Sequence, residues 1–457
     1  MQKNSSQTRF SNQLLHVLHV QLGVLVAPFI FIAALTGLLY ALTPQIEHAV
    51  YQKQLFAVHD LSQSEQALSL QVAAAQAALP AQAVITAVRP APQPNATTRV
   101  LYLDPKDPEH SHAVFINPYT LAVQGQLPVY GTSGVLPIRT FLDNLHRNLL
   151  LGTFGRAYSE LAASWLGIFA LTGLWQWYRK RQQMKVTTQH PRQKNLRWHA
   201  WVGLGVFPML LFFSATGLTW SNWSGANIAK LRHLANSDTP TLNTQLSPKS
   251  MSMPMDAHAE HHMPMQMSAH HQPLVLKNFD VIEKLAQQNG LTSEYLQIKP
   301  SYSSDKAWTI EEMRHRWPIQ VDAIAVDMQQ QKVIDQIEFA KFPLSAKLTR
   351  WGVDAHIGVL FGGVNQLVLV LSGALILVLV AFAYRAWWSY AHVRSTLQHL
   401  NRQVFRLWQS ANSVQRGISL VVLAILYFLM PVWVLSLLSL QIMLWLLNLR
   451  KPETLPE

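Results

Sequence analysis

Long uncharged stretches constrain this chain more than any other feature of its sequence. A helix needs roughly 20 apolar residues to cross a bilayer. Apolar segments run at about 20–43, 160–178, 201–220, 357–384 and 417–449. The first four each predict one membrane span, whereas the last is too long for one and contains Met430-Pro431, which favours a helical hairpin. The sequence therefore predicts an integral membrane, mainly α-helical protein with a bundle of about six transmembrane helices.

The basic residues predict how these spans are oriented. The net charge is +12, and two interior segments carry basic residues without any acid, seven Lys and Arg in 179–197 and five Arg in 385–416. By the positive-inside rule, both segments and both termini lie in the cytoplasm, and the loops 44–157 and 221–354 face the periplasm. We therefore expect a multi-pass protein of a bacterial inner (cytoplasmic) membrane. Because the basic residues lie where topology needs them, they predict contact with anionic membrane lipid and no nucleic-acid partner.

Each periplasmic loop predicts one small α+β module. Helical periodicity covers 63–79 in the first loop and 278–289 in the second. Short β-rich runs follow each helix, separated by turns. They lie at 84–88, 99–103 and 113–117 in the first loop, and at 295–299, 307–312 and 319–326 in the second. The order of span, module and span thus occurs twice, as a pseudo-twofold internal repeat.

These patterns divide the chain into nine segments. In order, we expect transmembrane helix 1 (1–43), periplasmic module 1 (44–145), transmembrane helix 2 (146–180), a basic cytoplasmic loop (181–196), transmembrane helix 3 (197–221), periplasmic module 2 (222–353), transmembrane helix 4 (354–386), a cytoplasmic segment (387–416) and a transmembrane hairpin (417–449).

Four histidines occupy matching positions in the two halves. His199 lies 180 residues after His19, and both lie at the cytoplasmic end of a span. His146 and His356 precede the second span of each half, at its outer end. An ionisable side chain inside a span is costly and usually faces a cavity or a partner. Neutral imidazole is a common ligand of haem iron, so the pattern indicates haem.

A pseudo-twofold axis would pair these histidines across the bundle. Six-coordinate haem takes two ligands from opposite faces of the ring. We therefore expect two haem b groups, an inner one on His19 and His199 and an outer one on His146 and His356. His16 is an alternative to His19, three residues earlier and on a neighbouring helix face.

Glycines and arginines accompany the histidines. Gly23 and Gly203 each lie four residues after a histidine, on the same helix face, where they leave room for a flat macrocycle or serve ordinary helix packing. Arg139 and Arg350 precede the outer histidines by seven and six residues. A guanidinium there is suited to a haem propionate or an anionic substrate, or is simply a solvated loop residue.

The tract 251–271, MSMPMDAHAEHHMPMQMSAHH, has a different composition. It lacks large aliphatic and aromatic side chains, so it cannot form a core. Thioethers and imidazoles are ligands that suit copper, Cu(I) in particular. The candidate copper ligands are Met251, Met253, Met255, His258, His261, His262, Met263, Met265, Met267, His270 and His271. The tract predicts a copper site in the second module, or a low-complexity linker that binds metal adventitiously.

Short motifs recur in a fixed order around the four histidines. They lie at 19–23, 145–152, 198–203 and 355–362, with Thr-Gly-Leu at 36–38, 172–174 and 216–218 and Ser-Gly-Ala at 372–374. This ordered set resembles the PepSY-associated transmembrane family over about 10–390. The resemblance implies two PepSY-like periplasmic modules. Because some members of that family are haem-containing inner-membrane reductases of iron–siderophore complexes, it also implies that activity.

The expected function is therefore electron transfer across the membrane. No Gly-rich nucleotide fingerprint follows a predicted strand, so electrons would come from a separate donor, either quinol or a cytoplasmic reductase. We expect a membrane-bound, haem-dependent reductase of a periplasmic ferric siderophore or of Cu(II). Two alternatives stay open. One is a non-enzymatic regulator or assembly factor of PepSY type, and the other is a periplasmic copper-handling protein.

Overall fold

The computed structural model describes residues 15–16, 19–20, 22–58, 63–181, 190–246, 273–389, 408–409 and 411–449. The chain divides into two compact units, and each is considered by itself. The helical unit comprises Met1–Ala41, Asp143–Asn236 and Leu367–Glu457, and the sheet unit comprises Leu42–Leu142 and Ser237–Gln366. Both units are assembled from both halves of the sequence.

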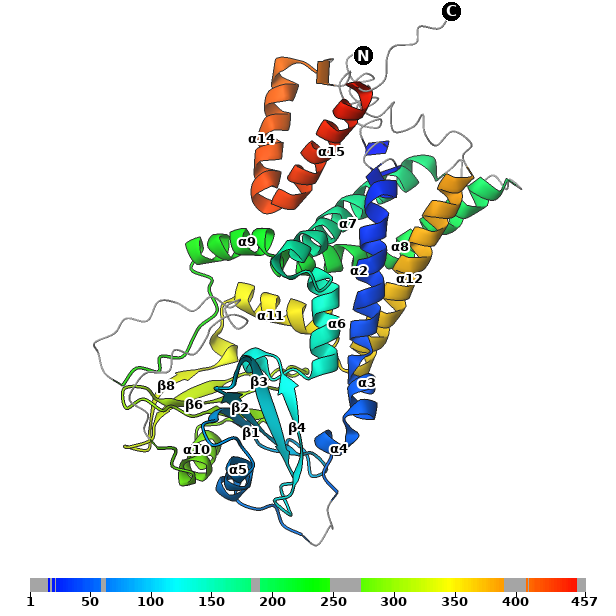
Figure 1. The fold of residues 1–457 in the computed structure, drawn as a ribbon. Coiled ribbons are helices and arrows are strands. Elements are labelled where there is room, and N and C mark those ends of the chain that lie inside the picture. Colours follow the sequence, from blue (N-terminus) through cyan, green and yellow to red (C-terminus); the bar gives the residue numbers. More distant parts are fainter. Residues whose placement is uncertain are drawn as a thin grey trace, which may run out of the picture. The chain divides into compact units, whose positions relative to one another are not determined.

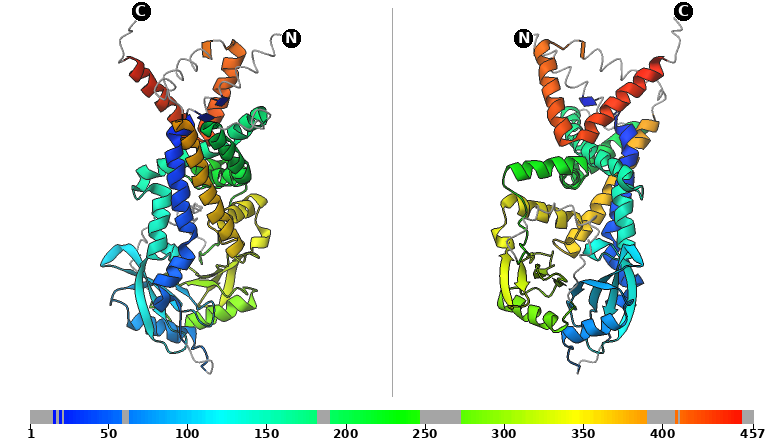
Figure 2. Two further views of the ribbon diagram at one scale, coloured as in Figure 1. Left: turned by 90° about the vertical axis from the view of Figure 1, so that its right-hand side faces the viewer. Right: turned by 60° about the vertical axis from the view of Figure 1, so that its left-hand side comes forward.

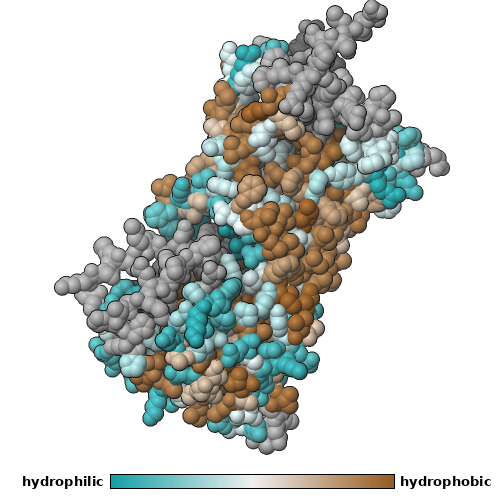
Figure 3. Space-filling view, viewed as in Figure 1, coloured by the Kyte–Doolittle hydropathy of each residue, from teal (hydrophilic) through white to brown (hydrophobic). Residues whose placement is uncertain are grey.

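Three helices in the described part of the chain are long and apolar enough to cross a membrane. They are α2 (Leu22–Ala41), α8 (Pro191–Thr219) and α12 (Gly363–Trp388). Their outward side chains are apolar, and Figure 3 shows these residues gathered over α2 and α12. Such a surface is stable against lipid and would be unfavourable in water. The chain is therefore a membrane protein with three candidate spans.

The other predicted spans form helices that do not meet the same criteria. The second coincides with α7 (Gly152–Lys180), which packs along α8 and α2. The predicted hairpin comprises α14 (Ser413–Leu429) and α15 (Pro431–Leu449), which diverge from a shared turn (Figure 2). The turn lies at Met430-Pro431, as expected, and Pro431 begins α15 because proline fits the first turn of a helix. A bundle of six spans remains a prediction.

A buried carboxylate fixes α9 (Trp223–Leu234) within the helical unit. Glu160 of α7 has no exposed surface. Its oxygens accept hydrogen bonds from the backbone nitrogens of Trp223 and Ser224 at 3.0 and 3.1 Å, and from the Ser224 hydroxyl at 2.6 Å. These are the unpaired donors at the start of α9. The second module was expected to begin at 222, whereas α9 belongs to the helical unit and the sheet unit resumes at Ser237.

The sheet unit contains one antiparallel sheet rather than two separate ones. Its eight strands run in the order β4-β3-β2-β1-β5-β6-β7-β8. They are β1 (Val84–Arg89), β2 (Thr98–Asp104), β3 (Asp107–Ile116), β4 (Val123–Val129), β5 (Leu296–Lys299), β6 (Trp308–Glu312), β7 (Ala323–Asp327) and β8 (Lys332–Ile337). The two predicted modules join where Val88 of β1 pairs with Ile298 of β5. Strand β8 was not predicted from the sequence.

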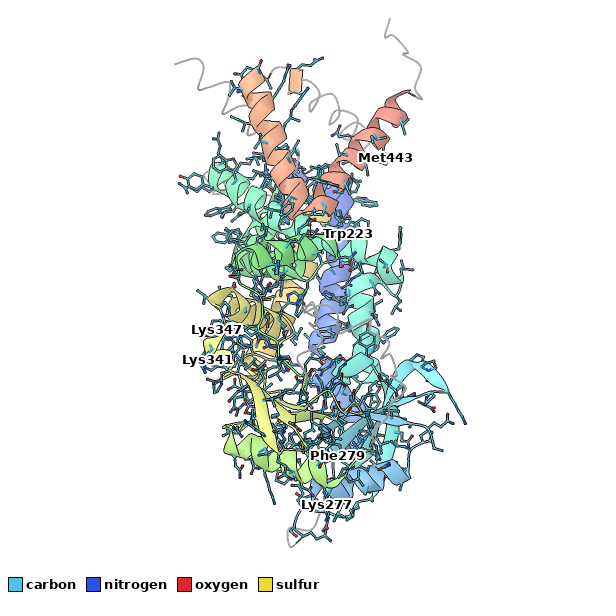
Figure 4. The ribbon with its side chains drawn as sticks, turned by 90° about the vertical axis from the view of Figure 1, so that its left-hand side faces the viewer. Trp223, Lys277, Phe279, Lys341, Lys347 and Met443 are labelled. Atoms are coloured by element: carbon cyan, nitrogen blue, oxygen red, sulfur yellow. The ribbon has the colours of Figure 1, made fainter. Side chains whose placement is uncertain are left out.

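Two helices cover one face of this sheet. These are α5 (Leu68–Ala77) and α10 (Lys277–Gln288), the two helices expected from periodicity (Figure 1). Their apolar sides and the facing strands form one core, in which Phe279, Val72 and Ile310 have no exposed surface. Figure 4 shows Phe279 on the side of α10 toward the sheet, and Lys277 on its outer side.

The remaining helices of the sheet unit are short and lie close in sequence to the points where the chain passes from one unit to the other. They are α3 (Thr43–Val50), α4 (Gln52–Leu55), the first half of α6 (Pro137–Asn148), whose second half belongs to the helical unit, and α11 (Leu344–His356). No helix was predicted for most of α6 and α11, whose last three residues were assigned to transmembrane helices 2 and 4. Helices α6 and α11 carry Arg139 and Arg350, and their last residues include His146 and His356.

Candidate functional site

The two histidines predicted for the inner membrane side lie next to each other in the helical unit. His19 lies in the short helical turn before α2, and His199 lies in α8. Their ring centres are 6.2 Å apart and their planes are inclined by 69°. Both rings are half-buried. The pair thus comes from the two halves of the repeat, as expected, and its role as a ligand pair stays a prediction.

Each of these rings is held through Nδ1. The His19 Nδ1 lies 3.1 Å from the Thr172 hydroxyl oxygen on α7. The His199 Nδ1 lies 3.0 Å from the backbone carbonyl oxygen of Leu379 on α12. Phe169 of α7 meets the edge of the His19 ring at 5.9 Å between ring centres. Two helices, α7 and α12, therefore fix the orientation of the two imidazoles.

His146 repeats the arrangement of His19 at another place in the helical unit. Its Nδ1 lies 3.0 Å from the hydroxyl oxygen of Thr36 on α2. The histidine before α2 thus contacts α7, and the histidine before α7 contacts α2. This reciprocity is the local form of the internal repeat.

The glycines that approach the histidines are those of two of the three Thr-Gly-Leu triplets, at 36–38 and 172–174. A Cβ on Gly173 would lie 2.8 Å from the His19 Cε1, and one on Gly37 would lie 3.1 Å from the His146 Cε1. By contrast, a Cβ on Gly23 would meet nothing within 4 Å, and one on Gly203 only a Leu379 methyl at 3.4 Å. The only sign of these glycines in the sequence was the recurrence of the triplet. Spacing along one helix does not reveal which histidine of another helix the triplet contacts.

His356 belongs to the sheet unit, whereas His146 belongs to the helical unit. It is the last residue of α11 and is half-buried. The loop after it is ordered by the Asn365 amide, which donates to the Ala355 carbonyl at 2.9 Å. The proposed pairing of His146 with His356 at an outer haem stays a prediction.

Both candidate arginines are paired with acids within the sheet unit. Arg139 of α6 donates to a Glu47 carboxylate oxygen at 2.8 Å. Glu47 is only 7% exposed, and burial raises its pKa although Arg139 lies beside it. Among the described residues, the other oxygen of Glu47 and the Arg139 Nε have no hydrogen-bond partner, and both atoms are buried. Arg139 is therefore an ordered, ion-paired residue rather than a solvated loop arginine.

Arg350 lies in a three-residue cluster. Its Nε is 3.2 Å from an Asp354 oxygen one helical turn later, and its guanidinium also contacts the His315 ring. The His315 Nδ1 is 3.2 Å from the other Asp354 oxygen. Asp354 is 1% exposed, so its charge is balanced inside the protein. No motif in the sequence connects His315 with α11.

His16 differs from His19 in its surroundings. It is exposed, and its Nδ1 lies 3.3 Å from the Gln176 side-chain oxygen. His19 has the second imidazole beside it, which favours it over His16 as the inner ligand. The tract 251–271, with its candidate copper ligands, lies outside the described residues. Within those residues, no group of three or more His, Asp or Glu side chains is arranged to hold a metal ion.

The comparisons with known proteins bear on the whole chain. A search of curated proteins found no significant match. The model of the PepSY-associated TM region matches residues 17–389, which include the four histidines and both arginines. The chain therefore belongs to the family of the PepSY-associated TM region.

Proposed function

We propose that this chain is a di-haem inner-membrane reductase that carries electrons across the membrane to a metal complex in the periplasm. The observation that carries the proposal is the pairing of His19 with His199 inside the helical unit. Family membership is consistent with it, because the resemblance implies haem-containing reductases among the members. The haem supplies one-electron transfer when bound, and the protein supplies the ligands and their surroundings.

The geometry of the pair fits a bis-imidazole haem. A metal–imidazole nitrogen bond is about 2.0–2.1 Å long, so two imidazoles on opposite sides of one metal have ring centres about 6 Å apart. The observed separation is 6.2 Å. Two ligands are sufficient because the porphyrin supplies the other four. The site therefore needs no cluster of three protein ligands.

The surroundings of the pair fit the same group. His19 is fixed by Thr172 and Phe169, and His199 by the Leu379 carbonyl. A haem ligand is usually oriented in this way by a second hydrogen bond from its other nitrogen. The outer haem would take His146, which Thr36 holds in the same manner, together with His356.

The proposed substrate class is a periplasmic metal complex, because the outer haem would deliver electrons on the periplasmic side. A siderophore releases its iron more readily after Fe(III) is reduced to Fe(II), and Cu(II) would become Cu(I), for which the methionines of 251–271 are suitable ligands. The electron donor would be quinol or a separate cytoplasmic reductase. Two alternative functions would contradict this proposal. They are a regulator of PepSY type and a copper carrier that transfers no electrons.

The proposal can be tested in vesicles. Purified protein is placed in liposomes that enclose dithionite, and a ferric siderophore or Cu(II) is added outside with a chromophoric Fe(II) or Cu(I) chelator. We expect colour to develop with the wild-type chain and not with the His199→Ala variant. Equal, slow rates in wild-type, variant and empty vesicles would contradict electron transfer. A preference for iron or copper outside would identify the substrate.

A further inference from the structure

We propose that Thr172 and Thr36 are positioning residues that keep the proton of His19 and His146 on Nδ1, and so leave Nε2 of each ring as the lone pair for iron. The inference rests on the proposed haem function. It adds the two hydroxyl groups that select the tautomer of the ligands.

Each of the two threonine hydroxyl groups has a single proton to donate. The Thr172 hydroxyl oxygen lies 2.7 Å from the Ile168 carbonyl oxygen, one turn earlier in α7. The Thr36 hydroxyl oxygen lies 2.8 Å from the Ile32 carbonyl oxygen in α2. Both are ordinary lengths for an O–H···O bond. A threonine that donates its proton to its own helix can only accept from elsewhere.

The imidazole must then be the donor in both contacts. The Nδ1–oxygen distances of 3.1 Å for His19 and 3.0 Å for His146 are ordinary for N–H···O bonds. The backbone carbonyls three residues before each threonine, of Phe169 and Ala33, are second acceptors beside the two rings. A carbonyl oxygen cannot donate. A neutral imidazole with its proton on Nδ1 carries its lone pair on Nε2.

His199 reaches the same tautomer by another route. Its Nδ1 faces the Leu379 carbonyl oxygen at 3.0 Å, and that oxygen can only accept. Three candidate ligands thus share one protonation pattern, although two depend on a threonine and one on the backbone. The pattern is what metal-bound histidines usually show, because the second nitrogen donates to a fixed acceptor.

Each triplet also supplies space beside its hydroxyl. Gly173 and Gly37 follow the two threonines directly, and a Cβ at either position would come within 2.8 or 3.1 Å of the imidazole carbon. A threonine that only packed two helices would not need a glycine at the next position facing the same ring. The threonine hydroxyl accepts the hydrogen bond and the glycine leaves space for the ring edge. This arrangement occurs on α7 for His19 and on α2 for His146.

The test uses the full chain purified in detergent. Thr172→Val and Thr36→Val keep the side-chain shape and remove the hydroxyl. The matched control is Thr219→Val in α8, where the hydroxyl donates to the Thr216 carbonyl at 2.7 Å. Thr172→Ser retains the acceptor and serves as the rescue. Haem retention, the midpoint potential and the ferric low-spin EPR signal are measured for each.

We expect Thr172→Val to weaken retention of the inner haem by about 10- to 100-fold, the usual cost of losing such a partner. The midpoint potential of that haem should become more positive, because a less basic imidazole stabilises ferric iron less. Thr36→Val should change the outer haem in the same way, and Thr172→Ser should resemble the wild-type chain. If Thr172→Val and Thr219→Val both match the wild type, the inference is wrong even though the haems are present.

The tautomer can also be measured without haem. In the haem-free chain labelled with 15N-histidine, the ring-nitrogen shifts should show a proton on Nδ1 of His19 and His146. Thr172→Val should weaken that preference at His19, where the Phe169 carbonyl remains as an acceptor, and leave it unchanged at His146. A wild-type chain that never binds haem would overturn the proposed function, and Nε2–H tautomers in the haem-free chain would overturn the inference.

Discussion

At the scale of single residues, the sequence predicted that His19 and His199 lie together, but not what holds their rings. His19 and His199 could be matched because their spacing repeats, and the structure places their rings 6.2 Å apart. The contacts of Thr172 and Gly173 with His19 join residues more than 150 positions apart. Such contacts depend on how two helices are rotated about their axes, which a repeat in one sequence does not specify.

Gly173 provides a direct test of this packing. A Cβ there would lie 2.8 Å from the His19 Cε1, so the imidazole must move. We expect Gly173→Ala to weaken retention of the inner haem by about 10- to 100-fold, as displaced ligand geometry does. Haem per chain after size exclusion measures the effect. The control is Gly205→Ala, where a Cβ meets nothing within 4 Å. Equal haem content in the two variants would argue against the contact.

Glu47 predicts a pH dependence of stability in the sheet unit. Burial raises its pKa above the ordinary 4.5, so the folded state binds more protons at this site than the unfolded state. The stabilising contribution is complete below the unfolded pKa and is lost as the pH rises through the folded pKa. The melting temperature of the wild-type chain should therefore fall more from about pH 5 to pH 7 than that of Glu47→Gln. Parallel curves would exclude Glu47 as the titrating group.

At the scale of helices and strands, periodicity was sufficient to predict individual elements but not to predict which strands pair. Helices α5 and α10 and strands β1 to β3 lie where the alternation of apolar residues predicted them. The pairing of β1 with β5 was not predictable, because Val88 and Ile298 are separated by more than 200 residues and each sits on the edge of its own module. An unpaired strand edge must find a partner, and here the second module provides it.

The shared core beneath the sheet gives a prediction for one element. Phe279 of α10 is fully buried and packs edge-on against Trp308 of β6, with ring centres 5.0 Å apart. Phe279→Ala should lower the stability of this core by about 3–5 kcal/mol, seen as faster hydrogen exchange in α10 and β6. Lys277→Ala, on the outer side of the same helix (Figure 4), should change exchange by no more than about 0.5 kcal/mol. Equal protection in both variants would contradict a core centred on Phe279.

At the scale of the whole molecule, the internal duplication determines how much of the fold can be predicted from the sequence. Membership of the PepSY-associated TM family, the helices and strands of the sheet unit and the candidate spans follow from repeated patterns. The tract 251–271 has no counterpart in the first half, so the repeat says nothing about its role. Its composition alone connects it with copper.

The tract should be separable from the haems. Replacing 251–271 with a Gly/Ser segment of equal length, which forms a flexible linker, should abolish copper binding by the purified chain and leave its haem spectrum unchanged. Copper bound per chain, measured after dialysis, checks this. A loss of haem in this variant would mean that the tract contributes to folding or to the haem sites. Unchanged copper binding would remove the tract from the list of copper ligands.

The account depends most on the claim that His19 and His199 bind one haem between them. The decisive measurement is the haem content of the purified chain by pyridine haemochromogen absorbance, with the reduced spectrum, for the wild type and for His19→Ala, His199→Ala and His16→Ala. The account predicts two haem b groups per wild-type chain, one in each of the first two variants, and two in the third. A colourless, folded wild-type chain, or a full haem content in His19→Ala and His199→Ala, would contradict it.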